Sequence, residues 1–371
     1  MGRRSRNPHC SKKYPVPLFS GSWSGIWGEN EESEVTITGG EHVVILGGGG
    51  GGGRTGVANL VLLARYDFNK SALSDAFHEV STDNDPPYRM AALPGGEGFV
   101  CSLGNDCRLF TLKKAADDDG ETGIFHDALL RDALVRVLEG VGEQNSLVFS
   151  ADGTRLAAGG DDGYLRVFEW PSLKVILPKV KAHESIKDLD FSSDAAFLAS
   201  TSDDSGCKIW NLAEKTSTSL RSVKGEDYGF ARFSRDGTKR LLFVTTRKGS
   251  KGFVSAFDTS TWRKVKSKKL QEVPISAFAI SRDGKLLAIG SCEGDVAIVD
   301  AATLSILQWV RQAHMIFVTA MEFHPNGQAL LTVSADYSAR VTRIEPVGGN
   351  PWRGSVLLIV IFVLAMLVVI V

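Results

Sequence analysis

The sequence predicts an all-β fold, a seven-bladed propeller, followed by one C-terminal transmembrane helix. Two observations carry this prediction. A short phrase that ends in a turn recurs at nearly regular intervals, and residues 354–371 form an apolar run without a charged side chain. The composition agrees with a chain that folds around a core, because 43% of the 371 residues are hydrophobic and 23% are charged.

The recurring phrase is typified by Phe-Ser-Ala-Asp-Gly and is followed by a short apolar strand. It begins at Phe149, Phe191, Phe233, Ile280 and Phe323, at intervals of 42, 42, 47 and 43 residues. A degraded copy, residues 93–102, lies 56 residues before the first. A period of about 40 to 45 residues is typical of WD repeats, in which each unit is a four-stranded propeller blade. The Asp-Gly pairs supply the positive φ angles of tight hairpins.

The remaining elements follow in chain order. Residues 1–13 are basic, lack an apolar signal region and are expected to form a solvated arm. Residues 14–345 are expected to form the propeller: residues 14–68 contain three strand-like segments that supply a first blade, six repeats follow, and one blade closes with strands from both ends.

The last two elements are a juxtamembrane linker, residues 346–353, and the transmembrane helix, residues 354–371. A helix of 18 residues spans about 27 Å, close to the hydrocarbon thickness of the endoplasmic-reticulum membrane. A buried pair of strands is the alternative, but the run has no turn residue and no alternation. Trp352 and Arg353 favour the cytosolic interface, so the propeller should face the cytosol.

Polar residues in one repeat resemble the hydrogen-bonded His, Ser, Asp and Trp chain of WD repeats. These residues are His183, Ser200, Asp204 and Trp210. A His near a Ser and an Asp also suggests hydrolytic catalysis, but the repeat context favours a structural role, and His314 recurs at the same position of a later repeat.

Charge and cysteine usage exclude several function classes. Lys and Arg total 42 and Asp and Glu total 43, so the net charge of −1 provides no overall field for nucleic acid. The basic run at residues 263–269 alternates, which indicates an outward strand face. The five cysteines are never spaced as CxxC, which argues against a zinc site or a disulfide framework. We expect no nucleic-acid partner, no small-molecule substrate and no His/Cys metal site.

The exceptional feature is a run of seven glycines, Gly47 to Gly53, within a loop predicted at residues 47–59. Three interpretations compete. The spacing resembles a phosphate-binding P-loop, but Arg54 replaces its Lys and a strand-like segment follows where a helix should begin. The run could be a flexible linker, because glycine loses the most entropy on ordering. Alternatively, glycines let a loop press closely against a partner or turn its carbonyls toward a cation.

The first blade resembles that of the Sec-twelve-like guanine-nucleotide-exchange factors. The similarity rests on three features: the segment YPVPLFSGSW beginning at Tyr14, the strand ending in the glycine cluster, and the Gly-x-x-Asn at residues 56–59. Residues 87–90 and 165–171 also resemble plant members. The resemblance runs from Tyr14 to the apolar run. It implies an endoplasmic-reticulum membrane protein with a single span and a cytosolic propeller, which activates a Sar-type small GTPase and so starts COPII coats.

The resemblance also implies a site in the glycine loop. It implicates Asn59, Gly56 and Arg54 in nucleotide exchange, a non-covalent process rather than enzymatic bond formation. It also implies a potassium ion held by carbonyls of four consecutive glycines, Gly48, Gly49, Gly50 and Gly51. We expect the Asn59 amide to hold the loop backbone.

Two departures from the family pattern concern the loop and the end of the chain. The extra glycines Gly52 and Gly53 should loosen the loop, and we expect no lumenal domain after the apolar run. The alternative function is a non-catalytic membrane scaffold that assists exit of cargo such as a phosphate transporter, as in a plant branch of the family that lacks the glycine cluster. A nucleic-acid regulator is a third hypothesis.

Overall fold

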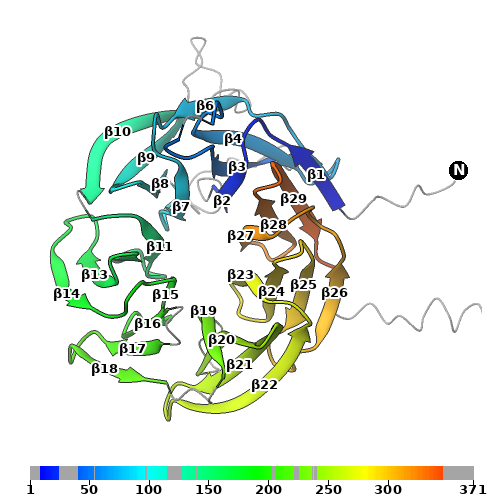
Figure 1. Cartoon of the computed structure of the whole chain (residues 1–371). Helices are drawn as coiled ribbons and strands as arrows, with labels where there is room; N and C mark the ends of the chain where they lie inside the picture. Colours follow the sequence, from blue (N-terminus) through cyan, green and yellow to red (C-terminus); the bar gives the residue numbers. More distant parts are fainter. Residues whose placement is uncertain are drawn as a thin grey trace, which may run out of the picture.

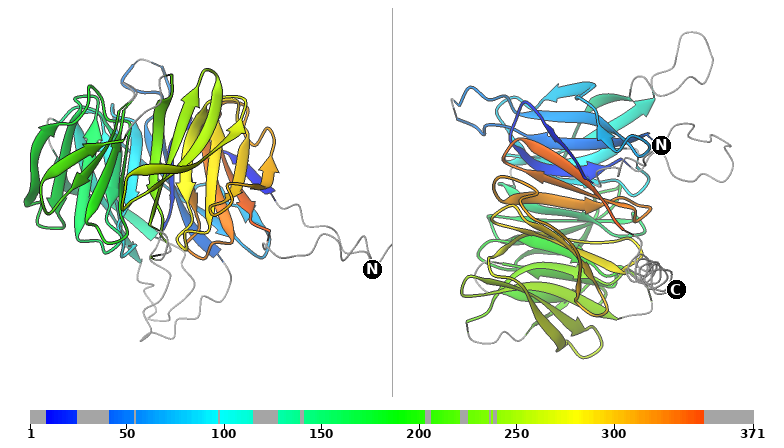
Figure 2. Two further views of the ribbon diagram at one scale, coloured as in Figure 1. Left: turned by 90° about the horizontal axis from the view of Figure 1, so that it is seen from below. Right: turned by 90° about the vertical axis from the view of Figure 1, so that its right-hand side faces the viewer.

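The structure of the chain is a computed structural model. It describes residues 9–345 apart from residues 25–40, 54, 97, 115–127, 139–140, 203–205, 221–224, 236 and 238–239. Within these residues, 29 strands form seven antiparallel sheets arranged as the blades of a ring (Figure 1). Seen from the side, the ring is a disc made of a single layer of blades (Figure 2). The all-β, seven-bladed propeller predicted from the sequence is confirmed.

Each blade uses consecutive strands, except where the ring closes. Blade 1 contains β2 (Leu18–Trp23), β3 (Glu41–Gly48), β4 (Leu60–Asp67), β5 (Ala72–Leu73) and β6 (His78–Ser81). Blade 2 contains β7 (Pro87–Ala92), β8 (Gly98–Leu103), β9 (Asp106–Lys114) and β10 (Ala128–Leu138). Blade 3 contains β11 (Gln144–Phe149), β12 (Arg155–Gly160), β13 (Tyr164–Glu169) and β14 (Val175–Lys181). Blade 4 contains β15 (Asp188–Phe191), β16 (Phe197–Thr201), β17 (Cys207–Asn211) and β18 (Thr216–Ser219). Blade 5 contains β19 (Asp227–Phe233), β20 (Leu241–Lys248), β21 (Lys251–Asp258) and β22 (Arg263–Gln271). Blade 6 contains β23 (Ile275–Ile280), β24 (Leu286–Ser291), β25 (Val296–Asp300) and β26 (Ile306–Val310).

Blade 7 combines both ends of the described chain. It contains β27 (Val318–Phe323), β28 (Ala329–Ser334), β29 (Ser338–Arg343) and, at its outer edge, β1 (His9–Lys13). The register pairs Cys10 with Val341, so the N-terminal strand completes the last blade. The sequence predicted such a closure, but the boundary between arm and propeller differs from the one expected at residues 13 and 14, because residues 9–13 belong to the blade.

The core lies between neighbouring blades, and strand β3 shows why the sequence alternates there. Side chains of a strand point alternately to its two faces. Val44 and Leu46 pack against Leu331 and Val333 of blade 7, whereas Ile45 packs against Phe99 of blade 2. Every position in this run is therefore buried, and each blade is held by the apolar faces of its two neighbours.

The recurring Ser-x-Asp-Gly phrase forms the hairpin between the first two strands of a blade. In blade 3, the Ser150 hydroxyl donates to Asp152 at 2.5 Å and accepts the Arg155 amide at 3.0 Å. Gly153 adopts a φ of +71°, which favours glycine. The same serine-to-aspartate bond recurs in blades 4 and 6. The phrase therefore recurs along this chain because it forms the turn between the first two strands of a blade.

Two further predictions concern the surface and the C-terminal residues. The basic run lies on β22, the outer strand of blade 5, with mostly exposed side chains, as alternation indicated. The predicted linker and transmembrane helix, residues 346–371, lie outside the described residues. Among the residues that are described, no helix has the length and apolarity needed to cross a membrane.

Candidate functional site

The glycine run spans the end of strand β3 and the connection from β3 to β4. Gly47 and Gly48 belong to β3 rather than to the loop, and Gly48 pairs with both Leu18 and Leu60. Glycine is required at the loop entrance by close approach: an added Cβ at Gly48 would lie 1.9 Å from the Pro17 carbonyl oxygen. The loop that leaves the strand, residues 49–59, therefore begins from a fixed and crowded base.

Asn59 closes this loop from its far end. Its side chain is only 3% exposed. The Gly51 amide donates to Asn59 Oδ1 at 3.1 Å, and Asn59 Nδ2 donates back to the Gly51 carbonyl at 3.3 Å. Gly51 adopts a φ of +84°, which suits glycine alone at low strain. The amide bonds expected of Asn59 are therefore present, whereas its role in exchange stays a prediction.

The same asparagine fastens the loop to the connection between blades 1 and 2. Asn59 Nδ2 also donates to the Asp83 carbonyl at 3.0 Å, and the Thr82 amide donates to the Asn59 carbonyl at 3.0 Å. Thr82 in turn donates through its hydroxyl to the Asp85 carbonyl at 2.7 Å. The base of the loop is thus ordered by polar contacts from residues that lie more than 20 positions away in the sequence.

The tip of the loop has a different character from its base. Gly52 and Gly53 are exposed, as are Thr55 and Gly56, and Gly56 has a φ of +74° with open space around it. Arg54, which the resemblance also implicated, lies outside the described residues. The structure therefore brings Gly48 to Gly51 and Asn59 together, while Gly56 lies on the exposed side of the loop.

The inside of the loop presents neutral oxygen atoms. An added Cβ at Gly49 would lie 2.1 Å from Asn59 Oδ1, and one at Gly50 would lie 2.1 Å from Thr55 Oγ1 and 2.9 Å from the Val57 carbonyl oxygen. Amide, hydroxyl and carbonyl oxygens are the donors that a hard cation prefers. Among the described residues, no group of three or more His, Cys, Asp or Glu side chains is placed to hold a metal ion. Oxygens of this kind are the type of ligand that a monovalent cation would need, and a potassium ion at this place stays a prediction.

The P-loop interpretation fails on the element that follows the glycines. A phosphate-binding loop needs a helix N-terminus after it, where backbone amides and the helix dipole attract the phosphates. Here the chain continues into strand β4, which pairs with β3 over its whole length. The flexible-linker interpretation does not describe the base of the loop, because Asn59 and Pro17 fix it.

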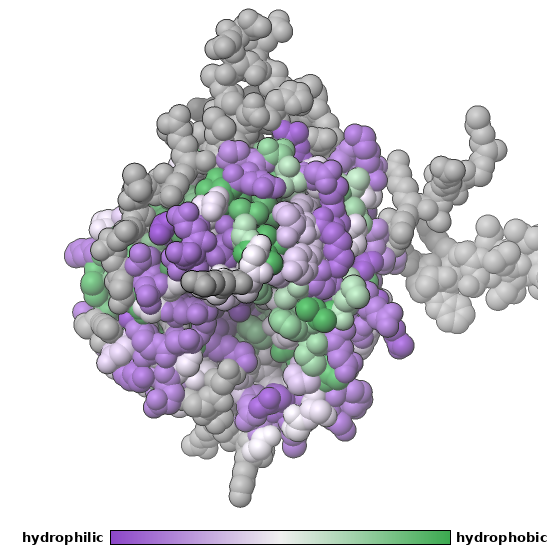
Figure 3. Space-filling model, turned by 45° about the horizontal axis from the view of Figure 1, so that its top comes forward, coloured by the Kyte–Doolittle hydropathy of each residue, from purple (hydrophilic) through white to green (hydrophobic). Residues whose placement is uncertain are grey.

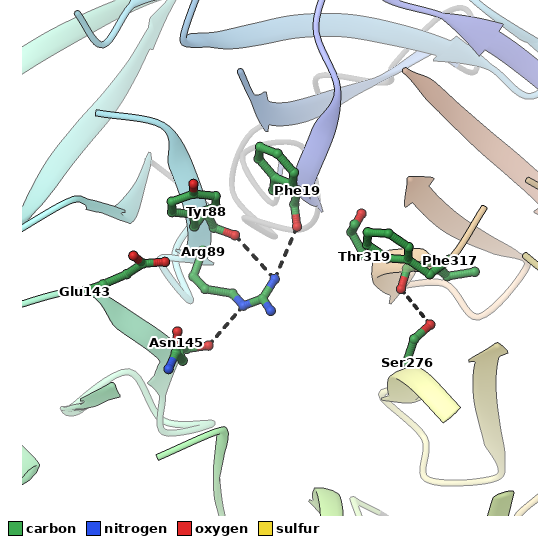
Figure 4. A pocket seen from close by; sticks show the side chains of 9 residues that line it. Phe19, Tyr88, Arg89, Glu143, Asn145, Ser276, Phe317 and Thr319 are labelled. Atoms are coloured by element: carbon green, nitrogen blue, oxygen red, sulfur yellow. Dashed lines mark hydrogen bonds between the residues drawn. The ribbon is translucent and has the colours of Figure 1, made fainter. Parts of the chain in front are cut away.

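A small cavity lies beside the loop at the mouth of the central channel. Its volume is about 200 Å³, and it is lined by Phe19, Tyr88, Arg89, Glu143, Asn145, Ser276, Phe317, Val318 and Thr319. Figure 4 shows Phe19, Tyr88 and Glu143 on one side of the opening and Phe317 and Thr319 on the other. The Phe19 and Tyr88 rings lie 5.0 Å apart. No sequence pattern indicates this cavity, because its residues come from five blades.

Two charged side chains, Arg89 and Glu143, line this cavity. Arg89 donates to the carbonyls of Asn145, at 2.9 Å, and Phe19, at 3.3 Å, and so joins blades 1, 2 and 3. Burial lowers the pKa of this guanidinium. Burial, with Asp161 nearby, raises the pKa of the Glu143 carboxyl. Neither arrangement places an acid and a base around a reacting centre.

The repeat histidines are structural, as the sequence indicated. His183 Nε2 lies 2.9 Å from Ser200 Oγ, which also accepts the Trp210 indole N–H at 2.9 Å. Asp204 lies outside the described residues. His314 bonds Thr332 and Ser338 in the same manner. These buried groups tie strands of one blade together.

Comparison with known proteins adds independent evidence. The family "WD domain, G-beta repeat" matches residues 133–169, 174–211 and 306–342. "SEC12-like protein 2" of Arabidopsis thaliana is 37% identical over 302 residues, 80% of this chain and 75% of the relative. "SEC12-like protein 1" of the same plant is 38% identical over 291 residues, 77% and 71% of the two chains. "Guanine nucleotide-exchange factor SEC12" of Rattus norvegicus is 31% identical over 199 residues, 49% and 47%.

Proposed function

Because the chain belongs to the SEC12-like family of WD-repeat proteins, we propose that it is a guanine-nucleotide-exchange factor for a Sar-type small GTPase. Its place would be the endoplasmic-reticulum membrane, where it would initiate COPII vesicle formation and transport to the Golgi. The observation that carries the proposal is the glycine loop, residues 49–59, whose base Asn59 holds and whose tip is exposed.

Exchange in this proposal needs no covalent chemistry. A protein that binds the nucleotide-free GTPase more tightly than the loaded one lowers nucleotide affinity by the same factor, because the coupling free energy is reciprocal. A loop that is rich in glycine is suited to this task, since its backbone can lie close to the GTPase. Such a loop wedged beside the bound nucleotide favours the empty state of the GTPase.

Asn59 supplies the preorganisation that the loop needs. Seven consecutive glycines lose much conformational entropy on ordering, and this loss weakens binding unless it occurs before the partner arrives. Two bonds to Gly51 and one to Asp83 order the base in the free protein. The remaining freedom is confined to the tip around Gly52 and Gly53, where nothing within 3.5 Å would touch an added Cβ.

A potassium ion would complete this ordering. The carbonyls of Gly48 to Gly51 are the proposed ligands, and Asn59 Oδ1, Thr55 Oγ1 and the Val57 carbonyl are the neighbouring oxygens. When bound, the ion would supply positive charge that draws these dipoles together and stiffens the loop. Glycine would allow these oxygens to approach one another closely, because it carries no side chain.

Membrane attachment would concentrate the activated GTPase where it acts. The apolar run at residues 354–371 is the proposed single span, with the propeller on the cytosolic side. The scaffold alternative assigns the same location but no exchange. The presence of the ordered glycine loop favours the exchange factor over it.

The test is release of fluorescently labelled GDP from the Sar-type GTPase of Arabidopsis thaliana. The full chain in mild detergent should accelerate release in a dose-dependent way, faster in potassium chloride than in sodium chloride of equal ionic strength. Equal rates in the two salts would remove the ion from the account. No acceleration in either salt would reject the exchange function and leave a membrane scaffold.

A further inference from the structure

Three consecutive apolar residues lie exposed on the connection between blades 6 and 7. Met315 is 80% exposed, Ile316 40% and Phe317 43%. They form what we call the apolar ledge. Figure 3 shows that hydrophilic side chains cover most of the visible surface and that hydrophobic ones gather in a few patches. Contiguous exposed apolar side chains on a soluble domain are typical of an interaction surface.

The ledge is held in place by buried polar bonds. His314, only 3% exposed, lies 2.8 Å from the Thr332 hydroxyl and 2.7 Å from the Ser338 hydroxyl. The Met315 amide donates to Asp336 at 2.7 Å, and the Ser334 hydroxyl donates to the Phe317 carbonyl at 2.8 Å. The backbone of the ledge is therefore anchored at both ends, and its exposed side chains are presented by a rigid support.

The corresponding connection between blades 3 and 4 shows that the fold does not require apolar residues at this position. The loop between β14 and β15 carries His183, which bonds Ser200 as His314 bonds Thr332. There the histidine is followed by Glu184, whose side chain is 86% exposed, and by Ser185, before a buried Ile186. Both connections begin with a buried histidine bonded to the next blade, but the one before blade 4 exposes polar residues and the one before blade 7 exposes apolar residues.

The ledge lies next to the glycine loop. Strand β2 separates them: Leu18 pairs with Gly48, and the Leu18 carbonyl accepts the hydroxyl of Thr319 at 2.8 Å, two residues beyond Phe317. Phe317 also lines the small cavity opposite Tyr88 (Figure 4), and an added Cβ on Gly51 would lie 3.8 Å from the Tyr88 hydroxyl. Leu18 and Tyr88 therefore link the glycine loop to the ledge and the cavity.

We propose that the apolar ledge is the second contact for the small GTPase, packing against an apolar patch of that protein beside the glycine loop. This inference rests on the proposed function and assigns the ledge and the glycine loop different roles in binding the GTPase. The ledge and the cavity between Phe19 and Phe317 bind an apolar side chain of the partner and supply affinity, because burial of apolar area is favourable. The glycine loop supplies the preference for the nucleotide-free state.

Charge on the surrounding surface favours a protein partner over the lipid surface. Glu143 lines the cavity, and Glu293 and Asp295 lie on the β24–β25 turn, whose Gly294 packs directly against the backbone of the ledge. Carboxylates at these positions repel the anionic headgroups that attract peripheral proteins to a cytoplasmic leaflet. An apolar patch with these three carboxylates beside it fits a protein surface that carries basic groups next to its own apolar residues.

The test measures GDP release as a function of GTPase concentration, and binding of the full chain to immobilised nucleotide-free GTPase. The variants are Met315→Ser/Ile316→Ser and Phe317→Ser. The matched control is Val265→Ser, because Val265 is 59% exposed on outer strand β22, away from the loop. Circular dichroism melts of all variants check that the propeller remains folded.

We expect both ledge variants to raise the half-saturating GTPase concentration and the dissociation constant about tenfold, with the maximal rate changed by less than about twofold. The Val265 variant should match the unmodified chain. Unchanged affinity in the ledge variants, with exchange intact, would overturn this inference alone. Absence of binding and exchange by the unmodified chain would overturn the proposed function and the inference together. Lower retention on phosphatidylcholine–phosphatidylserine vesicles with unchanged GTPase affinity would instead make the ledge a lipid contact.

Discussion

The β3–β4 connection of blade 1 and the β24–β25 connection of blade 6 occupy the same position in their blades but differ in length and construction. Residues 292–295 suffice in blade 6, where the Ser291 hydroxyl accepts the amides of Glu293 and Asp295. Blade 1 uses residues 49–59, closed by Asn59. A blade therefore needs only a short turn at this position. The extra residues in blade 1 serve something other than the blade.

The largest expected effect separates two glycines that both have positive φ. Gly294 has a φ of +88°, and an added Cβ would lie 2.2 Å from the His314 carbonyl oxygen, whereas Gly56 has a φ of +74° and nothing within 4 Å. Gly294→Ala should reduce the free energy of unfolding by about 4 kcal/mol, against about 1 kcal/mol for Gly56→Ala. Urea unfolding measures both. Equal losses would mean that the two connections have the same structural role.

The next effect concerns the residues that close the two connections. Asn59→Ala should slow catalysed GDP release about a hundredfold, because the loop base loses three hydrogen bonds and must be ordered during binding. Ser291→Ala removes the corresponding bonds in blade 6 and should leave the rate unchanged. Each variant should lose only about 1–2 kcal/mol of stability. A normal rate with Asn59→Ala would show that the loop acts without this support.

Solution pH should separate the scaffold from the loop. Glu322 lines the central channel, and burial raises its pKa from 4.5 to about 7. Between these values the native state binds this proton and the unfolded chain does not, so stability falls as the pH rises. Burial also lowers the pKa values of His324 and His42, and these groups act in the opposite sense.

The difference between the chain and its Glu322→Gln variant isolates the carboxyl. Thermal melts should show the stability of the variant rising relative to that of the unmodified chain from pH 4.5 upward, by about 3 kcal/mol at pH 8. Exchange rates of the two proteins should stay equal across this range, because the described part of the glycine loop carries no titratable side chain. A parallel change in rate would couple the channel to the site.

The smallest effect concerns the tip of the loop. Gly52 has ordinary backbone geometry, and the nearest atom to an added Cβ is the Asn84 carbonyl oxygen at 3.6 Å. Gly52→Ala should therefore fit in the free protein and raise stability by about 0.5 kcal/mol through the unfolded state. We expect a change in exchange rate of less than about twofold. A tenfold loss would show that the tip backbone itself approaches the partner closely.

The repeats predicted the fold well because each one encodes its own turn. The Ser-x-Asp-Gly phrase fixes a hairpin locally, so its recurrence every 42 to 47 residues locates blades 3 to 7. The N-terminal boundary of the propeller is not encoded locally, since His9–Lys13 becomes a strand only by pairing with β29, more than 300 residues away. Pairing over that distance leaves no local pattern in a short basic segment.

The site was predictable only as far as its chemistry is local. Asn59 stands at the foot of a glycine run, where an amide side chain has backbone groups within reach, and its bonds to Gly51 follow from that position. Its contact with Asp83 and the cavity formed with Tyr88 and Phe317 depend on how blades 1, 2 and 7 pack. No spacing in the sequence reports those neighbours.

The most direct test of the central claim is the affinity of the full chain for one GTPase in two states. Biolayer interferometry would compare nucleotide-free and GDP-loaded Sar-type GTPase, with the unmodified chain and with Asn59→Ala. The account predicts a preference of about a hundredfold for the empty state, most of which the variant loses. Equal affinity for the two states would contradict it, because a protein without such a preference cannot promote nucleotide release.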